Sequence, residues 1–206
     1  MSIYEERKDK EQPVNQPADT PKDLYESLHN QLATLVDYDD SVIFLNDEIT
    51  DHTLTDLIIR VRSLLKHREY NKRKDDINLM INSPGGDVHE MFGIIDYIES
   101  LDVKVNTICR GRAFSAAAII LAGGTGTRMM SKRSTVMVHQ SSSFIGGKMS
   151  DITAYLDTVK NLEVAVYEFL ESRTEKSAEW WKDKMRTDLY LSAEELLELG
   201  VIDQII

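Results

Sequence analysis

The sequence lacks the features that mark a secreted or membrane protein. It has a single cysteine, Cys109, so no disulfide forms within the chain and an oxidising compartment is not implied. That cysteine lies in an apolar run, which predicts a buried, inert thiol. The first residues, MSIYEERKDKEQ, contain no apolar core of a secretory signal, and no apolar run is long enough to span a bilayer. We therefore expect a cytoplasmic protein.

Positive charge is also scarce. The chain has 24 Lys and Arg residues against 35 Asp and Glu residues, which gives a formal net charge of −11 at pH 7. Phosphate backbones and anionic lipids are bound by clustered Lys and Arg, so this balance argues against nucleic acid and membranes as partners. Solubility is the simplest interpretation of the acidic surface.

Proline is rare and unevenly placed. Three of the four prolines, Pro13, Pro17 and Pro21, lie in a polar and charged N-terminal stretch. Such a stretch buries little apolar surface, so residues 1–22 are expected to form a flexible polar segment. Residues 23–206 have ordinary globular composition and the length of one domain with a full core.

Apolar periodicity beyond this segment predicts strands that alternate with helices. A capping box at Ser192–Glu195 and a stop at Gly200 mark the last helix. Alternating elements of this kind form βαβ units, so the sequence predicts an α/β fold. The expected strands are 42–45, 77–81, 103–109 and 135–138, and the expected helices are 51–66, 88–101, 114–121, 150–173 and 192–200.

The first motif with possible chemistry is Asn82-Ser83-Pro84-Gly85-Gly86, between a predicted strand and a predicted helix. Adjacent glycines let the backbone approach a ligand closely, and a helix N-terminus presents free N–H groups. A simple strand-to-helix turn explains the same residues equally well.

The second motif is Ser115, at the start of a small apolar helix that follows a strand. There its hydroxyl can face a cleft, while the N–H of Ala116 and the helix dipole stabilise a developing oxyanion. The logic is that of a nucleophile elbow, although the usual G-x-S-x-G pattern is absent. An ordinary N-cap serine is the alternative, and for this motif alone it is the favoured one.

The third motif is His139, which an apolar strand over residues 135–138 delivers at its end. That is a suitable position for a general base, although a lone histidine is more often structural. The remaining histidines have no comparable setting and are assigned no role: His29, His52, His67 and His89.

Together these segments resemble the proteolytic subunit of Clp protease, the ClpP family. Several motifs in the family's order are more specific than any one of them. The resemblance covers most of the chain beyond the N-terminal segment. The matching pieces are VIFLNDEITDH (42–52), INSPGG (81–86), GRAFSAAAIILAG (111–123), VMVHQ (136–140), GGKMSDI (146–152) and LYLSAEELLELGVID (189–203).

The resemblance implies a serine endopeptidase that cleaves unfolded proteins or peptides through an acyl-enzyme. It assigns Ser115 as nucleophile, His139 as general base and Asp188 as the acid that orients the histidine. Only the resemblance selects Asp188 from the many acidic residues. It also implies an oxyanion hole formed by the backbone amides of Gly86 and Ala116, where Ala116 replaces the family's usual methionine. No cofactor or metal is implied for this chain, and ATP enters only through a partner unfoldase.

The family fold is a ClpP/crotonase-like arrangement of repeated ββα units with a handle helix. Gly146-Gly147 and the helix from Ser150 look like that handle, which joins two stacked heptameric rings of identical subunits around the active sites. The partners implied are therefore further copies of the chain, an AAA+ unfoldase and polypeptide substrates.

The chain departs from the family where partners bind. Asn78 and Met80 stand where the family has tyrosines that line the docking pocket of the unfoldase, and Arg110 and Arg112 flank the glycine before the nucleophile. Ser141 replaces the proline that usually follows His-Gln. We therefore expect the catalytic chamber to be retained and the ATPase partner to be altered or absent. Such drift suits a virus-encoded or otherwise specialised member.

Three other functions are compatible with parts of this pattern. A non-catalytic ring subunit and a specialised maturation protease that acts without the usual unfoldase both share the fold. An acyl-CoA enzyme of the crotonase superfamily also uses backbone amides as an oxyanion hole, but it does not need the triad. The presence of all three triad residues favours the peptidase.

Overall fold

The structure is a computed structural model that describes residues 37–141 and 147–206. The N-terminal segment expected over residues 1–22, and the boundary at residue 23, lie outside the described residues. So do His29 and Gly146.

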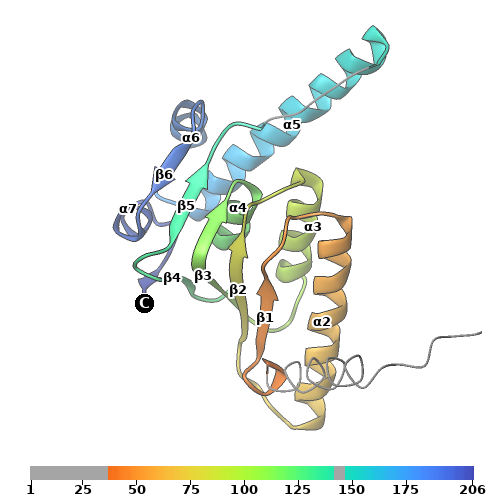
Figure 1. Ribbon diagram of the computed structural model, residues 1–206, viewed down its shortest axis with the longest axis vertical. Coiled ribbons are helices and arrows are strands. Elements are labelled where there is room, and N and C mark those ends of the chain that lie inside the picture. Colours follow the sequence, from red (N-terminus) through yellow and green to blue (C-terminus); the bar gives the residue numbers. More distant parts are fainter. Residues whose placement is uncertain (1–36, 142–146) are drawn as a thin grey trace, which may run out of the picture. The chain divides into compact units, whose positions relative to one another are not determined.

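A parallel sheet with the strand order β1-β2-β3-β4-β7 forms the centre of the domain (Figure 1). Its strands are β1 (Val42–Leu45), β2 (Ile77–Ser83), β3 (Val105–Phe114), β4 (Arg128–Met130) and β7 (Gln204–Ile205). The helices α2 (Asp51–Tyr70), α3 (Val88–Glu99) and α4 (Ala116–Ala122) connect the first four strands in turn. This alternation confirms the predicted α/β class.

Two further strands lie outside this strand order. β3 is long enough to pair with β4 through Thr107–Cys109 and with β5 (Thr135–Val138) through Arg112–Phe114. β6 (Leu189–Leu191) then runs antiparallel to β5. The carboxyl ends of β3 and β5 therefore lie at the same edge, and the chain that enters β6 meets them there.

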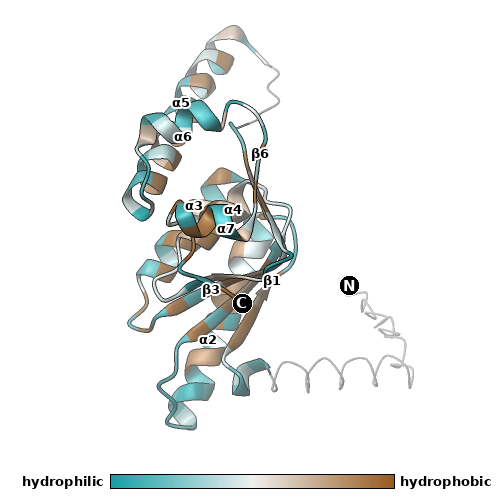
Figure 2. Cartoon of the chain, turned by 90° about the vertical axis from the view of Figure 1, so that its left-hand side faces the viewer, coloured by the Kyte–Doolittle hydropathy of each residue, from teal (hydrophilic) through white to brown (hydrophobic). Residues whose placement is uncertain are grey.

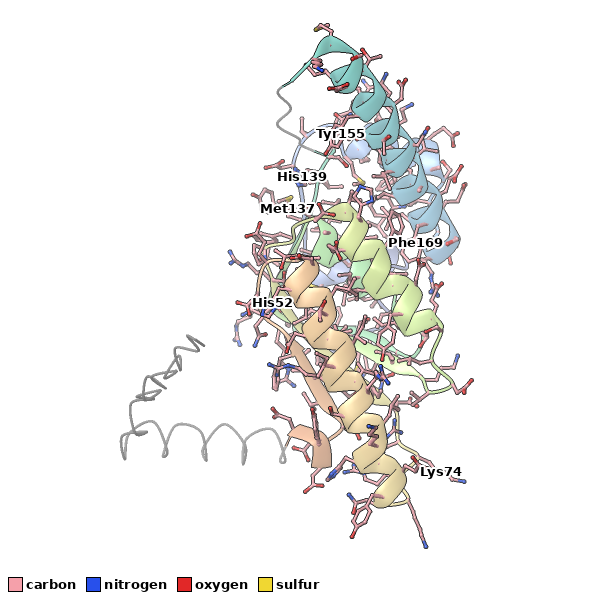
Figure 3. The ribbon with its side chains drawn as sticks, turned by 90° about the vertical axis from the view of Figure 1, so that its right-hand side faces the viewer. His52, Lys74, Met137, His139, Tyr155 and Phe169 are labelled. Atoms are coloured by element: carbon pink, nitrogen blue, oxygen red, sulfur yellow. The ribbon has the colours of Figure 1, made fainter. Side chains whose placement is uncertain are left out.

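The core lies between the sheet and the helices α2, α3 and α4. Alternation along β2 buries Ile77, Leu79 and Ile81, while Asn78 and Met80 on the opposite face are partly exposed. All seven residues of α4 are buried, and its small alanines let it lie close to β3. The strands and the helix faces turned toward them carry the hydrophobic residues (Figure 2), and α2 and α3 lie side by side (Figure 3).

The long helix α5 (Met149–Arg173) has two different halves. Its C-terminal half contributes Val166, Tyr167 and Leu170 to the core, whereas Met149 and Tyr155 in its N-terminal half are exposed. That half projects beyond the sheet (Figure 1). The helices α6 (Ala178–Lys184) and α7 (Ala193–Glu198) follow, and α7 begins at the predicted capping box of Ser192 and Glu195.

The predicted element boundaries are wrong around the nucleophile candidate. The third strand was expected to end at residue 109 and a helix to start at Phe114, but β3 continues through Phe114 and α4 begins at Ala116. Pairing with β5 supplies the ladder that keeps residues 112–114 extended. Four short elements, β4, α6, β6 and β7, were not predicted.

Candidate active site

Ser115 occupies the turn between β3 and α4 in a conformation that side chains rarely adopt. Its φ is +53° and its ψ is −125°, a backbone strain that persists only where the surroundings impose it. The Ser115 N–H donates to the carbonyl of Met137 on β5 at 2.7 Å, and the Ser115 carbonyl accepts from Ala118 at 2.9 Å. These two bonds hold the turn.

The side chain of Ser115 does not cap the helix. The residue stands at the N-cap position of α4, but its hydroxyl makes no capping hydrogen bond. The N-cap serine interpretation is therefore wrong for the side chain. A sharp strand-to-helix turn that frees the hydroxyl matches the nucleophile elbow in geometry, without the glycines of that motif.

His139 meets this hydroxyl. It follows directly after β5, whose parallel pairing with β3 brings the ends of both strands together. The Nε2 atom of His139 lies 2.9 Å from Ser115 Oγ, which is hydrogen-bond distance. With the ring proton on Nδ1, Nε2 accepts the serine proton. The sequence placed these two residues 24 positions apart, and the fold brings them together.

Asp188 approaches the other side of the imidazole. In the antiparallel pairing of β5 with β6, Val138 stands opposite Leu189, so the next positions outward are His139 and Asp188. His139 Nδ1 and Asp188 Oδ1 are 3.7 Å apart, beyond a hydrogen bond. The side chain of Asp188 is 59% exposed. The carboxylate is thus near the ring, but it does not fix the ring through a hydrogen bond.

Gly85, the first glycine of the pair, packs directly against the turn that carries Ser115. Gly85 has φ +93°, and a Cβ at this position would lie 2.4 Å from the Phe114 carbonyl oxygen and 2.8 Å from Ser115 Cβ. The close backbone approach that the glycines permit is therefore an approach to the turn that carries Ser115. A Cβ at Gly86 would instead lie 2.2 Å from the Ile49 carbonyl oxygen, so close backbone approaches on two sides require the glycine pair.

The backbone N–H of Gly86 points away from Ile49, the residue that pairs with this loop. It forms a parallel bridge with Ile49, in which the Ile49 N–H donates to Gly85 and the Asp87 N–H donates to Ile49. In a parallel bridge those bonds use the flanking residues, so the N–H of Gly86 points to the opposite side. The Ala116 N–H belongs to the first turn of α4 and has no acceptor within the helix. Both residues line one cavity with Ser115 and His139.

That cavity has a volume of about 300 Å³, enough for one large side chain. Its walls come from α3, α4, β5, α5 and the residue that ends α6. Polar and apolar surface contribute about equally to them, and the apolar residues include Met91, Ile119, Val138, Leu162, Val166 and Met185. Tyr155 also lines it and lies at the same end of the domain as His139 (Figure 3).

Two residues of the cavity were missed by sequence reasoning. His89, which was assigned no role, lies in the first turn of α3 three residues after Gly86, and it lines the cavity. Its position next to the glycine motif could have indicated this. Glu163 lines the cavity from α5, and no local signal in the sequence marks it. The other described histidines lie elsewhere, and His67 is paired with Asp39 at 2.9 Å.

In residues 37–141 and 147–206, no group of three His, Cys, Asp or Glu side chains is arranged to hold a metal ion. Over this part of the chain, no helix combines the length and apolarity needed to cross a bilayer.

Comparison with known proteins identifies the family. The Clp protease family model matches residues 26–206. The chain is 33% identical over 166 residues to ATP-dependent Clp protease proteolytic subunit 1 of Prochlorococcus marinus subsp. pastoris, covering 80% of this chain and 83% of the relative. It is 34% identical over 168 residues to the subunit of the same name from Shouchella clausii, covering 81% and 85%. The chain therefore belongs to the Clp protease family, and its class is that of a peptidase.

Proposed function

We propose that the protein is a serine endopeptidase in which Ser115 is the nucleophile and His139 the general base. The observation that carries this proposal is the 2.9 Å contact between Ser115 Oγ and His139 Nε2, made by a serine held in a strained turn. A hydroxyl in that position has a base within reach of its proton, which is the first requirement of nucleophilic catalysis.

The remaining residues supply the charge stabilisation that acyl transfer needs. Ser115 Oγ attacks the peptide carbonyl while His139 takes its proton, and Asp188 favours the imidazolium that forms. The amides of Gly86 and Ala116 donate to the oxyanion. The imidazolium then protonates the leaving amine, and water hydrolyses the acyl-enzyme by the same route. Each oxyanion donor in such sites contributes about 3 kcal/mol to transition-state stabilisation.

The protein acts, in this proposal, as the proteolytic component of an ATP-dependent Clp protease in the cytoplasm. Identical subunits form two stacked heptameric rings, and ATP is used by a partner unfoldase. At the positions of the family's docking tyrosines, Asn106 Nδ2 donates to Asn78 Oδ1 at 3.0 Å, and Met80 lies one strand position further along the same face. An amide pair offers an unfoldase different contacts from those of aromatic rings, which supports an altered or absent ATPase partner.

Active-site labelling tests the proposal. The wild-type protein, Ser115→Ala and His139→Ala are treated with a fluorophosphonate, and intact masses are measured after folding is checked by circular dichroism. We expect one label per wild-type subunit, none on Ser115→Ala and very slow labelling of His139→Ala. Labelling of Ser115→Ala at the wild-type rate would refute the assignment of the nucleophile.

A non-catalytic ring subunit is the second candidate, and one observation favours it. The 3.7 Å gap between His139 and Asp188, with an exposed carboxylate, leaves the imidazole without a hydrogen-bonded orienting partner. Failure of the wild type to label, in a protein that light scattering shows to be a folded ring, would select this function. A stable monomer would contradict both ring models.

A further inference from the structure

The cavity beside Ser115 contains a charge that the proposed mechanism does not use. We propose that this cavity accepts a lysine or arginine side chain of the substrate residue on the acyl side of the scissile bond, and that Glu163 selects it. The inference deepens the proposed function, because it concerns the specificity of the same site.

The charged residues that line the cavity have one sign. Asp87 and Glu163 each bring a carboxylate, and no Lys or Arg is among the described residues of the lining. The Asp87 carboxylate is engaged as the N-cap of α3, where it accepts from the N–H groups of His89 at 2.7 Å and Glu90 at 3.3 Å. The positive end of the α3 dipole also offsets the charge of Asp87, whereas Glu163 lies in the middle of α5, so Glu163 is the better placed to select a cation.

Glu163 is held in place by neighbours that donate to it. Its Oε1 accepts from the Ser141 N–H at 3.3 Å, and its Oε2 accepts from the Gln140 side chain at 3.4 Å. Tyr167 lies one turn further along α5 and also lines the cavity. Burial, reinforced by the Glu163 carboxylate, raises the pKa of Tyr167 to about 12, so this residue remains neutral at physiological pH.

This carboxylate still has room for a further donor. An ionised carboxylate offers about four lone-pair positions, and the Ser141 and Gln140 donors account for two of them. A carboxylate fixed in advance loses little entropy when a ligand binds, which is the general advantage of a preorganised site. The head group of a lysine or arginine can therefore complete the shell of Glu163.

The remaining walls suit the stem of the same side chains. Leu162 precedes Glu163 on α5, and Ile119 and Met185 face the cavity from α4 and from the end of α6. Long basic side chains pack their methylene groups on apolar surface while the charged head reaches a polar partner. A substrate glutamate or aspartate would instead bring a second negative charge toward Glu163, at a partly buried position where repulsion exceeds its value in bulk water.

Two peptides that differ at one position test the inference. They carry either lysine or norleucine on the acyl side of the scissile bond; norleucine keeps most of the lysine stem and lacks the ammonium group. The measured quantity is the ratio of kcat/KM for lysine to that for norleucine. We expect Glu163→Gln to lower this ratio by about tenfold, the scale of one hydrogen bond to a charged group. A glutamate peptide should be the poorest wild-type substrate.

The matched control is Glu171→Gln, which changes an exposed glutamate of α5 outside the cavity lining. It should leave the ratio at the wild-type value. An equal ratio in wild type and Glu163→Gln would overturn the inference. If the ratio is unchanged because kcat/KM falls equally for both peptides, Glu163 acts by positioning the segment after His139.

Binding separates this inference from the proposed function. In the Ser115→Ala background, calorimetry with the lysine and norleucine peptides reports the cavity without turnover. Tighter binding of the lysine peptide that disappears in Ser115→Ala/Glu163→Gln supports the specificity, even if the wild type cleaves neither peptide and the peptidase proposal fails. Equal binding of the two peptides refutes the specificity.

Discussion

Replacing Gly85 by alanine would disturb the proposed nucleophile, Ser115, while all three residues of the proposed triad are retained. The new Cβ would lie 2.4 Å from the Phe114 carbonyl oxygen, whereas real Cβ contacts stay above 3.0 Å, so the loop must retreat by about 0.6 Å or more. The φ of +93° adds strain of about 1–3 kcal/mol for an L side chain. Displacements of about 1 Å in an active site cost roughly 100-fold in rate. We expect fluorophosphonate labelling to slow by about that factor.

The assay is the second-order labelling rate, measured by intact mass beside a thermal melt. At about 2–4 °C per kcal/mol for a domain of this size, the strain lowers Tm by several degrees. The control is Gly147→Ala, because Gly147 also has positive φ, at +147°, but a Cβ there meets nothing within 4 Å. Labelling of Gly85→Ala at the rate of Gly147→Ala, in folded protein, would refute the idea that this loop supports Ser115.

Two other predictions concern stability and reactivity. Arg128 donates hydrogen bonds of 2.6 to 3.0 Å to Asp203, and these bonds lower the pKa of the Asp203 carboxyl below 3.8. The ionised carboxylate therefore stabilises the fold above pH 3.8. This contribution is lost as the pH falls through the pKa of the folded state. The urea midpoints of wild type and Asp203→Asn should therefore differ at pH 7 and converge on acidification, and a constant difference would contradict the pairing. Burial raises the pKa of the Cys109 thiol to about 11, so a disulfide reagent should modify it only as fast as the protein unfolds. Rapid modification of the native protein would contradict that burial.

Local patterns in the sequence predicted most elements, including two four-residue strands, and missed the strands of two or three residues. The strands 42–45 and 135–138 were predicted with their observed bounds, because short apolar runs flanked by polar residues decide them. The end of β3 was misplaced, since residues 112–114 are extended by pairing with β5, a strand that lies more than 20 residues away. Strands of two or three residues, such as β6 and β7, depend on such partners entirely.

The residues of the candidate site also differ in how far local sequence could predict them. Ser115 and His139 stand at the ends of strands, where local sequence indicates an exposed functional group, and their contact follows from the parallel pairing of those strands. Asp188 could be named only through the family resemblance, because its place beside His139 depends on the register of β5 with β6. No pattern in the sequence indicated Glu163, because its place in the cavity depends on how α5 packs in the tertiary structure.

The antiparallel pairing of β5 with β6 has a consequence for how the protein is made. Ser115 and His139 leave the ribosome well before Asp188, which is residue 188 of 206, and β6 begins only at the next residue. Contacts between distant segments form late in folding because loop closure precedes them. A nascent chain therefore carries the serine and the histidine of the proposed triad but not its carboxylate until 49 further residues after His139 have been synthesised. Under that proposal, translation order itself delays the appearance of hydrolytic activity next to other unfolded chains.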